Sequence, residues 1–424
     1  MKQICLIFHT HQPVRLKDYR FYEIGGTSSY FNEELNKNWL TKTANKKFIP
    51  VNKVLLDIFN NPHLQFKVSF SFSGCTLDLF EAFTPNLIEN LKMMNQRGNV
   101  EFLGETYSNT LTGESSPEDL IFRIENQKKK IFNLFGQIPS SFRNNGSHCN
   151  FFLSPILADL GYKVLLNNTA EVFVSLTHPN TIYQFPERPD IKLLFGNKEL
   201  AEAISEPKGN DSKKPMTADL LVKWINELPE EENIVTLFID YSTFIKDQSS
   251  DTILMDFLRE LPNKAKESNI GFITPAEIIK NKNFKEMPIS TKSIQSQKKT
   301  NKIEAEDKLL QKEIFDLLFS LKNKVYKTKN DHLIKTWYYL QDYNHFGILD
   351  QKNQSKDFNQ YGFQETIGTY ISLRNILQDL SSKVNLLLEE KNCDFGQTFR
   401  LSDPNKWSFQ KDTIPNKEQK YLIF

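Results

Sequence analysis

The sequence predicts an α/β protein in which a barrel of mainly parallel strands is followed by an all-helical C-terminal region. Short apolar runs of β type alternate with helical patterns over the first two thirds of the 424 residues. Repeated βα units favour a parallel sheet, and their number favours a barrel over a short open sheet. We therefore expect a barrel over residues 1–282, a linker or surface excursion over 283–303 and a helical region over 304–424.

Seven apolar runs have the length and composition of strands, because they are short and are bounded by helical patterns or turn signals. They are residues 3–8, 65–72, 99–104, 162–167, 191–196, 233–240 and 271–274. One more short run, just before Phe142, is expected to be a buried strand.

Helical patterns with apolar residues three and four apart lie between these strands. They cover residues 50–59, 84–96, 116–135, 216–228 and 252–261. The stretches SSPED (115–119) and TPAE (274–277) carry helix-start signals, a hydroxyl cap and a proline with an acid in the first turn. After the polar stretch, residues 304–341 and 363–391 have helical patterns, and the last thirty or so residues show no period and are expected to wrap the surface.

Composition narrows the classes of partner. Lys and Arg number 53 and Asp and Glu 52, so the formal charge is +1 and no net field attracts nucleic acid or an anionic membrane. The four cysteines are far apart and contain no CxxC pair, which gives no zinc or disulfide pattern. The apolar run before His9 is too short for a signal peptide. We expect a soluble cytoplasmic protein with a neutral partner, and the oligomeric state stays open.

Polar residues at the carboxyl ends of the strands are the candidates for chemistry, because reactive groups of parallel βα folds gather there. In FHTHQP (8–13), strand alternation would place His9 and His11 on one side, where they could bind a metal, donate to a sugar or fill the barrel end. In NVEFLGETYSN (99–109), Glu101 is expected to be a solvated acid, whereas Glu105 is expected to face a cleft.

Two further strand ends carry candidates. The apolar run in IVTLFIDYSTF (234–244) delivers Asp240 to its end, and a carboxylate there is costly to bury unless it is paired or used. The stretch FRNNGSHC (142–149) offers Arg143, asparagines and His148 but no acid.

Five of these motifs together resemble glycoside hydrolase family 57, the α-amylase-like family of α-glucan hydrolases, branching enzymes and glucanotransferases. They occur in the family's order: His11-Gln12-Pro13, VEFLGETY (100–107), FRNNG (142–146), LFIDYSTF (237–244) and YNHF (343–346). YFNEELNKNWL (30–40) and FSFSGCTLDLFE (70–81) are also similar to the family. The resemblance implies an incomplete, seven-stranded (β/α) barrel followed by helices, and a retaining mechanism without a nicotinamide or metal cofactor.

The resemblance also assigns roles. A retaining glycosidase needs two carboxyl groups about 5–5.5 Å apart. In the family the acid/base is an aspartate of the fourth motif, which falls on Asp240, and the nucleophile is a glutamate of the third motif, which falls on Gly146. The family often has a second glutamate where this chain has Ser242. Such a loss of nucleophile could cost on the order of 10⁴ or more in rate, so we expect weak or no double displacement.

Three functional interpretations remain open beside a purely structural barrel. In the first, the chain binds an α-glucan (starch, glycogen or a maltooligosaccharide) or a related sugar; the expected binding residues are His9, His11, Gln12, Glu105, Tyr107, Arg143, His148, Tyr241 and, from the helical region, His345. In the second, Asp240 and Glu105 act as an inverting pair, which requires a separation of roughly 6.5–9.5 Å. In the third, a metal-dependent hydrolase of the polysaccharide deacetylase type uses His9, His11, Asp240 and His148, although the paired acids and HxxxH of those enzymes are absent.

Overall fold

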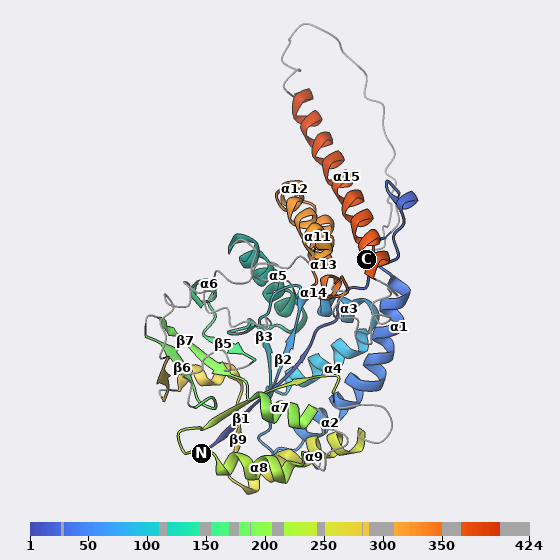
Figure 1. Cartoon of the computed structure of the whole chain (residues 1–424). Helices are drawn as coiled ribbons and strands as arrows, with labels where there is room; N and C mark the ends of the chain where they lie inside the picture. Colours follow the sequence, from blue (N-terminus) through green and yellow to red (C-terminus); the bar gives the residue numbers. More distant parts are fainter. Residues whose placement is uncertain are drawn as a thin grey trace, which may run out of the picture.

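The computed structural model describes most of the chain as an α/β body with a group of C-terminal helices beside one end of it, from which α15 projects (Figure 1). The described residues are 1–26, 29–109, 117–144, 154–168, 178–186, 188–205, 216–243, 251–281, 283–287, 309–349 and 366–398. Within them, no helix is both long enough and apolar enough to cross a membrane.

Seven parallel strands of the described part form the barrel. They are β1 (Gln3–Thr10), β2 (Val68–Phe72), β3 (Val100–Leu103), β4 (Ser141–Asn144), β5 (Val164–Asn167), β7 (Arg188–Phe195) and β8 (Ile234–Asp240). One sheet has the order β3-β2-β1-β8, and the other contains β7, β5 and β4 as neighbours. Two isolated parallel bridges, Gly104 with Phe142 and Gly196 with Thr236, join the sheets. The seven strands thus form a ring that single bridges close at two seams, which agrees with the seven-stranded barrel that the resemblance implies.

Three short strands lie outside this ring. They are β6 (Tyr183–Phe185), β9 (Gly271–Phe272) and β10 (Lys285–Glu286). β6 pairs antiparallel with β7, β10 pairs with β6, and β9 pairs with the start of β1. β6 and β10 are additions to the predicted strands, and β10 lies inside the segment expected to be a linker, most of which is outside the described residues.

Helices cover the outside of the strands (Figure 1). They are α1 (Glu33–Thr43), α2 (Ile49–Phe59), α3 (Gly74–Phe83), α4 (Pro85–Gln96), α5 (Pro117–Phe135), α6 (Ser154–Asp159), α7 (Lys198–Ser205), α8 (Ala218–Glu227) and α9 (Asp251–Glu267), with single turns η1 (Phe21–Glu23), η2 (Ala44–Phe48) and η4 (Pro275–Lys280). The start signal at 274–277 is confirmed, because Thr274 and Glu277 form a capping box at η4. α5 begins at Pro117 with two acids in its first turn, and the hydroxyl cap expected before it lies outside the described residues.

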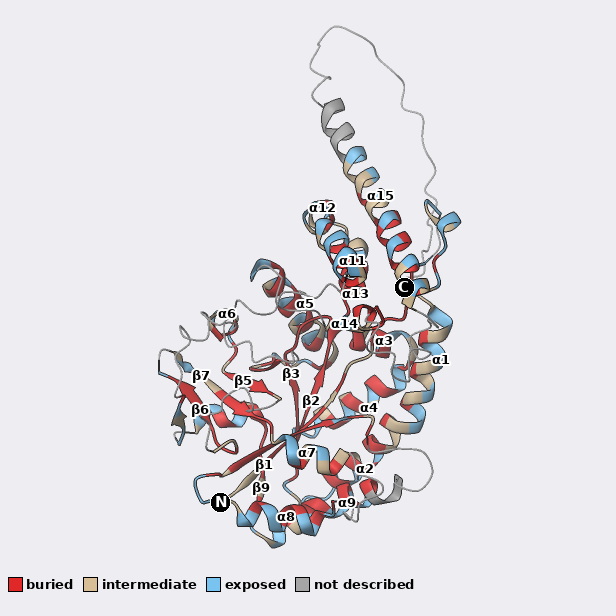
Figure 2. Cartoon of the chain, in the orientation of Figure 1, coloured by how far each residue is buried: buried red, intermediate tan, exposed pale blue. Residues whose placement is uncertain are grey.

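The strands are buried on both faces, as parallel strands under helices must be, and Figure 2 shows them as the most buried layer. Alternate residues serve two different cores. Ile4, Leu6 and Phe8 of β1 pack in the large cluster that the helices cover, whereas Cys5 and Ile7 belong to the small cluster inside the barrel. Because side chains alternate along a strand, His9 continues the inward set.

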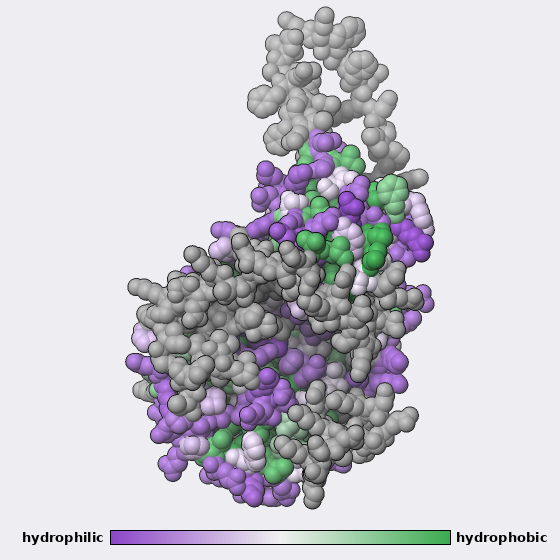
Figure 3. All heavy atoms as spheres, viewed as in Figure 1, coloured by the Kyte–Doolittle hydropathy of each residue, from purple (hydrophilic) through white to green (hydrophobic). Residues whose placement is uncertain are grey.

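The C-terminal helices form a second core against the carboxyl end of the barrel. They are α11 (Leu309–Ser320), α12 (Lys322–Thr328), α13 (Asp331–Leu340), α14 (Tyr343–Gly347) and α15 (Thr366–Thr398). Their cluster is centred on Trp337, and it includes Leu16, Tyr19 and Tyr107 from barrel loops. Figure 3 shows hydrophobic and hydrophilic side chains mixed over these helices, and mainly hydrophilic ones, with a small hydrophobic group at the lower end, over the coloured part of the body.

Candidate active site at the carboxyl end of the barrel

Four of the predicted residues lie on inward positions of the strands or just after them. His9 is the register partner of Asp240 across the pairing of β1 with β8. Glu105 follows β3, and Arg143 lies on β4, whose residue Phe142 packs outward. Parallel strands expose their carboxyl ends at one edge, so these side chains meet at the mouth of the barrel.

Glu105 and Arg143 form a buried ion pair, with Arg143 Nη1 donating to Glu105 Oε1 at 2.7 Å. The Ser71 hydroxyl donates to the same carboxylate oxygen. Both charged side chains are nearly inaccessible, Glu105 at 1% and Arg143 at 3%. The prediction that Glu105 faces a cleft is therefore wrong in this structure, because its charge is neutralised inside the barrel rather than offered to solvent.

Arg143 is held by more than this ion pair. Its Nε donates to Asn168 Oδ1 at 3.3 Å, and its guanidinium lies 5.5 Å from the centroid of the Phe238 ring. Burial and the nearby Arg143 charge lower the pKa of His9 well below its usual range. His9 is therefore neutral at physiological pH, and its imidazole can both donate and accept a hydrogen bond.

Asp240 differs from Glu105 because it is exposed at the last position of β8. Its Oδ1 accepts hydrogen bonds from the backbone N–H of Ser242 at 2.7 Å and from the Ser242 hydroxyl at 2.6 Å. These two bonds fix the carboxylate in one orientation. A fixed, solvent-accessible carboxyl group at the barrel mouth is suited to proton transfer.

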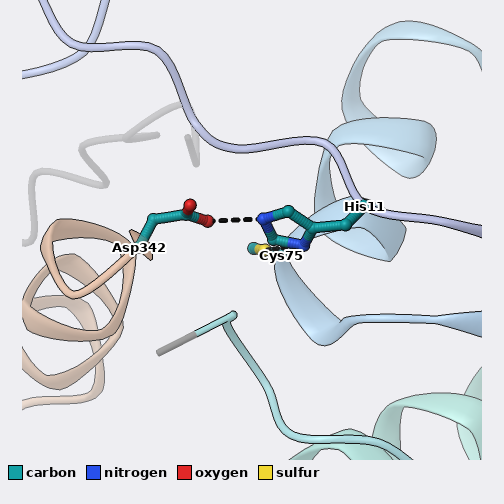
Figure 4. A group of neighbouring side chains, drawn as sticks. All are labelled: His11, Cys75 and Asp342. Atoms are coloured by element: carbon teal, nitrogen blue, oxygen red, sulfur yellow. Dashed lines mark hydrogen bonds and ion pairs between the residues drawn. The ribbon is translucent and has the colours of Figure 1, made fainter. Parts of the chain in front are cut away.

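His11 lies one residue past the end of β1, and its ring contacts Ser73 and Asp342. Its Nε2 lies 2.6 Å from Asp342 Oδ2 (Figure 4), and its Nδ1 lies 2.8 Å from Ser73 Oγ. Burial disfavours the charged form of His11, but the Asp342 carboxylate and the Cys75 sulfur outweigh burial and raise its pKa well above the usual range. Because the Nε2 of His11 is directed at Asp342, the structure places His11 in a different group of side chains from His9 and Asp240, which were expected to share a metal with it.

Asp342, Ser73 and Cys75 are site residues that the sequence did not predict. Asp342 caps α14, where its Oδ1 accepts from the backbone N–H of Asn344 at 3.0 Å. Burial works against its charge, but His11 keeps the pKa of Asp342 below its usual value. The available signal was the helix start DYN just before the YNHF motif, since an aspartate there is a typical cap. Nothing in the local pattern indicates its long-range partner, 331 positions away.

Three aromatic or imidazole residues expected to bind sugar are packed instead. Tyr241 is fully buried, with its ring stacked on Phe48 at 4.7 Å. The reason is strand alternation: Asp240 faces inward, so its neighbour faces the helices. Tyr107 is 7% exposed and donates to Asp78 at 2.5 Å, and His345 is 1% exposed with its Nε2 3.1 Å from the carbonyl oxygen of Val14. These three rings offer no open stacking face in this structure.

Gln12 and Glu101 are both held by hydrogen bonds to other parts of the chain. Gln12 is half-buried; its backbone N–H donates to Thr76 Oγ1 at 2.8 Å and its side-chain oxygen accepts from Arg15 at 3.4 Å. Glu101, expected to be solvated, is 8% exposed and accepts from the backbone N–H of Ala276 at 2.8 Å. That expectation is wrong because Glu101 shares the inward side of its strand.

Gly146 and His148 lie outside the described residues. β4 includes Phe142, Arg143 and Asn144, so the strand extends into the stretch that the sequence analysis treated as a loop after a strand. The rest of that stretch, 145–149, is also outside the described residues. The assignment of Gly146 to the family's nucleophile position therefore stays a prediction from the motif.

Comparison with known proteins agrees with the fold and the motifs. The sequence profile of glycosyl hydrolase family 57 matches residues 5–292. A protein of Methanocaldococcus jannaschii described as "Putative alpha-amylase" is 30% identical over 282 residues, which are 65% of this chain and 59% of that protein. The chain thus spans less than two thirds of this relative.

Solved structures share the fold at low identity. The 4-alpha-glucanotransferase of Thermococcus litoralis has a TM-score of 0.62 and 13% identity, covering 89% of this chain and 60% of that one. The GH57-type branching enzyme of Pyrococcus horikoshii has a TM-score of 0.59 and 12% identity, covering 98% and 99%. The alpha-amylase AmyC of Thermotoga maritima has a TM-score of 0.61 and 10% identity, covering 94% and 96%. Because the family profile covers more than half of the sequence, the chain is a member of glycosyl hydrolase family 57.

Proposed function

We propose that the chain binds an α-glucan at the mouth of the barrel and catalyses its hydrolysis weakly or not at all. The observation that carries this proposal is the contrast between two carboxylates at the mouth. Asp240 is exposed and oriented by Ser242, whereas Glu105 is buried against Arg143. One free carboxyl group can transfer a proton, but a double displacement needs two that act on the sugar.

The substrate class is supported by the relatives. The solved structures with this fold include a glucanotransferase, a branching enzyme and an amylase, and the curated relative is described as an amylase. Neutral His9 and the exposed Asp240 supply hydrogen-bonding groups of the kind that sugar hydroxyls need. No net charge is required for a neutral glucan, in agreement with the formal charge of +1.

The loss of the nucleophile is supported by the motif alone. Gly146 stands where the resemblance places the family's glutamate. Among the described residues, Glu105 is the acid that was considered as a partner for Asp240. Its carboxylate is already bound by the Arg143 guanidinium and the Ser71 hydroxyl group. A carboxylate held in this way is a poor nucleophile and a poor base, which also weighs against an inverting pair with Asp240.

Isothermal titration calorimetry with maltoheptaose tests the binding. Wild-type chain should bind, and Asp240→Asn should change the affinity by less than about tenfold, because the amide keeps the hydrogen-bonding shape. Asp256→Asn, an exposed acid on α9, is the control and should bind as the wild type does. Absence of binding by a folded wild-type chain would refute the proposal.

A further inference from the structure

The side chains of His11, Cys75 and Asp342 converge from three elements that are far apart in the sequence. His11 follows β1, Cys75 is in the first turn of α3, and Asp342 caps α14. Their ligand-type atoms, one from each side chain, all lie within 4.8 Å of one another (Figure 4). We propose that these three side chains form a binding site for a zinc-like divalent metal ion.

The donor set fits this class of metal. Imidazole nitrogen, thiolate sulfur and carboxylate oxygen are the groups that bind Zn²⁺, and three protein ligands leave a fourth position of the tetrahedron for water or another ligand. A neutral imidazole, one thiolate and one carboxylate also balance the two positive charges of the ion. The site would therefore carry no net charge, which suits its position, because Cys75 and Asp342 are each 1% exposed.

Two of the three ligands, His11 and Asp342, already have an outer partner that orients them. Ser73 Oγ lies 2.8 Å from Nδ1 of His11, so Nδ1 can donate to Ser73 while Nε2 faces the ion. Asn344 donates to Oδ1 of Asp342 from its backbone at 3.0 Å and from its side chain at 2.8 Å, which leaves Oδ2 directed at His11. Such outer partners fix the tautomer and the orientation of metal ligands.

Cys75 supplies the third ligand. It is the second residue of α3. Its Sγ lies 3.9 Å from Nδ1 of His11 and 3.3 Å from Ser73 Oγ. Cys75 is thus one of three ligands that converge from different elements of the chain.

Metal binding requires His11 and Asp342 to move slightly apart. The 2.6 Å separation of His11 Nε2 and Asp342 Oδ2 is that of a hydrogen bond. In a tetrahedral zinc site two N and O ligands are about 3.3 Å apart, given metal–ligand bonds of about 2.0–2.1 Å. The ion would take the place of the shared proton, and the two side chains would separate by less than about 1 Å.

The position of the site gives it a consequence for the fold. It would join the loop after β1, the start of α3 and the start of α14, and so would tie the barrel to the C-terminal helices. Asp240 and Glu105 are not among its ligands, so metal binding can be measured directly in the absence of glucan, whereas His11 is shared with the expected glucan-binding residues.

Cobalt binding to the full-length chain tests the site directly. Metal-stripped wild-type chain titrated with Co²⁺ should show the near-ultraviolet absorption of a thiolate bound to cobalt, with one ion per chain, and Zn²⁺ should displace it. Cys75→Ser should remove this absorption and weaken Zn²⁺ binding by about 100-fold or more, and Ser73→Ala should weaken it by about 10–100-fold. Cys5→Ala, a change at another buried free cysteine, should leave both unchanged.

Two results would contradict the metal site. The proposal is wrong if wild-type chain binds Zn²⁺ with a Kd above about 1 µM, or if the cobalt absorption persists in a folded Cys75→Ser variant. Should that variant fail to fold, alkylation of wild-type chain followed by mass spectrometry decides. Zn²⁺ must then protect Cys75, and equal alkylation with and without Zn²⁺ contradicts the site.

Discussion

Asp342 Oδ2 lies 2.6 Å from Nε2 of His11, so a buried contact links the C-terminal helices to the end of the first barrel strand. The side chain of His11 is 13% exposed and that of Asp342 is 1% exposed. Removing one partner of a buried charged pair leaves the other charge without compensation, which costs about 3–5 kcal/mol.

Asp342→Asn should therefore lower the free energy of unfolding by about 3 kcal/mol, the lower end of this range, because asparagine can still cap α14. Urea denaturation without added metal measures the loss. Asp256→Asn removes one partner of an exposed ion pair with Arg259 and should cost less than about 1 kcal/mol. Equal losses in the two variants would contradict the buried pair.

The buried pair of Glu105 and Arg143 predicts strong coupling. Arg143→Met leaves the Glu105 carboxylate unpaired inside the barrel and should destabilise the chain by about 3–5 kcal/mol. Adding Glu105→Gln removes the uncompensated charge, so the double variant should recover a large part of this loss. A double-mutant cycle measured by urea denaturation checks it, and additive losses would show that the two side chains do not interact.

Side chains alternate between the two faces of a strand, and this alternation accounts for several of the correct and the wrong predictions of burial. The apolar runs of β1, β2 and β8 were predictable because strands under helices are apolar on both faces. The same alternation turns the side chain of Asp240 inward at the mouth. It also turns the next residue, Tyr241, outward into the core under the helices, and the prediction that Tyr241 binds sugar overlooked this. The buried state of Glu105 was not predictable, because its partner Arg143 lies on a different strand and only the closed ring brings them together.

Glu101 predicts a pH dependence of stability. Burial is the largest influence on this carboxyl group, and although hydrogen bonds oppose it, the pKa is raised from 4.5 to about 7. Between these values the folded chain keeps a proton that the unfolded chain has lost, so this group makes stability fall as the pH rises, by about 3 kcal/mol in total. Below the unfolded pKa, both states are protonated and the effect vanishes.

Glu101→Gln lacks this titration. The free energy of unfolding of the variant, minus that of the wild type, should therefore increase by about 3 kcal/mol between about pH 4.5 and about pH 8. Glu277 and other acids titrate in both proteins, so most of their contribution cancels in the difference. A difference that stays constant over this range would contradict the raised pKa.

Gly74 at the start of α3 has no room for a side chain. A Cβ there would lie 2.5 Å from the ring of Tyr107. That ring is buried and its hydroxyl group is bound to Asp78, so it cannot move away freely. Gly74→Ala should destabilise the chain by about 1–3 kcal/mol.

Gly347 at the end of α14 provides the matched control, since a Cβ added there meets nothing within 4 Å. Gly347→Ala should be neutral or stabilising by up to about 1 kcal/mol. Thermal unfolding of the two variants beside the wild type makes the comparison. A neutral Gly74→Ala would mean that Tyr107 is not held as tightly as its contacts indicate.

The release of reducing ends from maltoheptaose tests the central claim, that a glucan site keeps its proton-transferring aspartate but lacks a nucleophile. Wild-type chain should release them no faster than Asp240→Asn does, and Gly146→Glu, which restores the acid of the family motif, should raise the rate in a manner that depends on Asp240. Rapid release by wild-type chain that is lost in Asp240→Asn would contradict the claim.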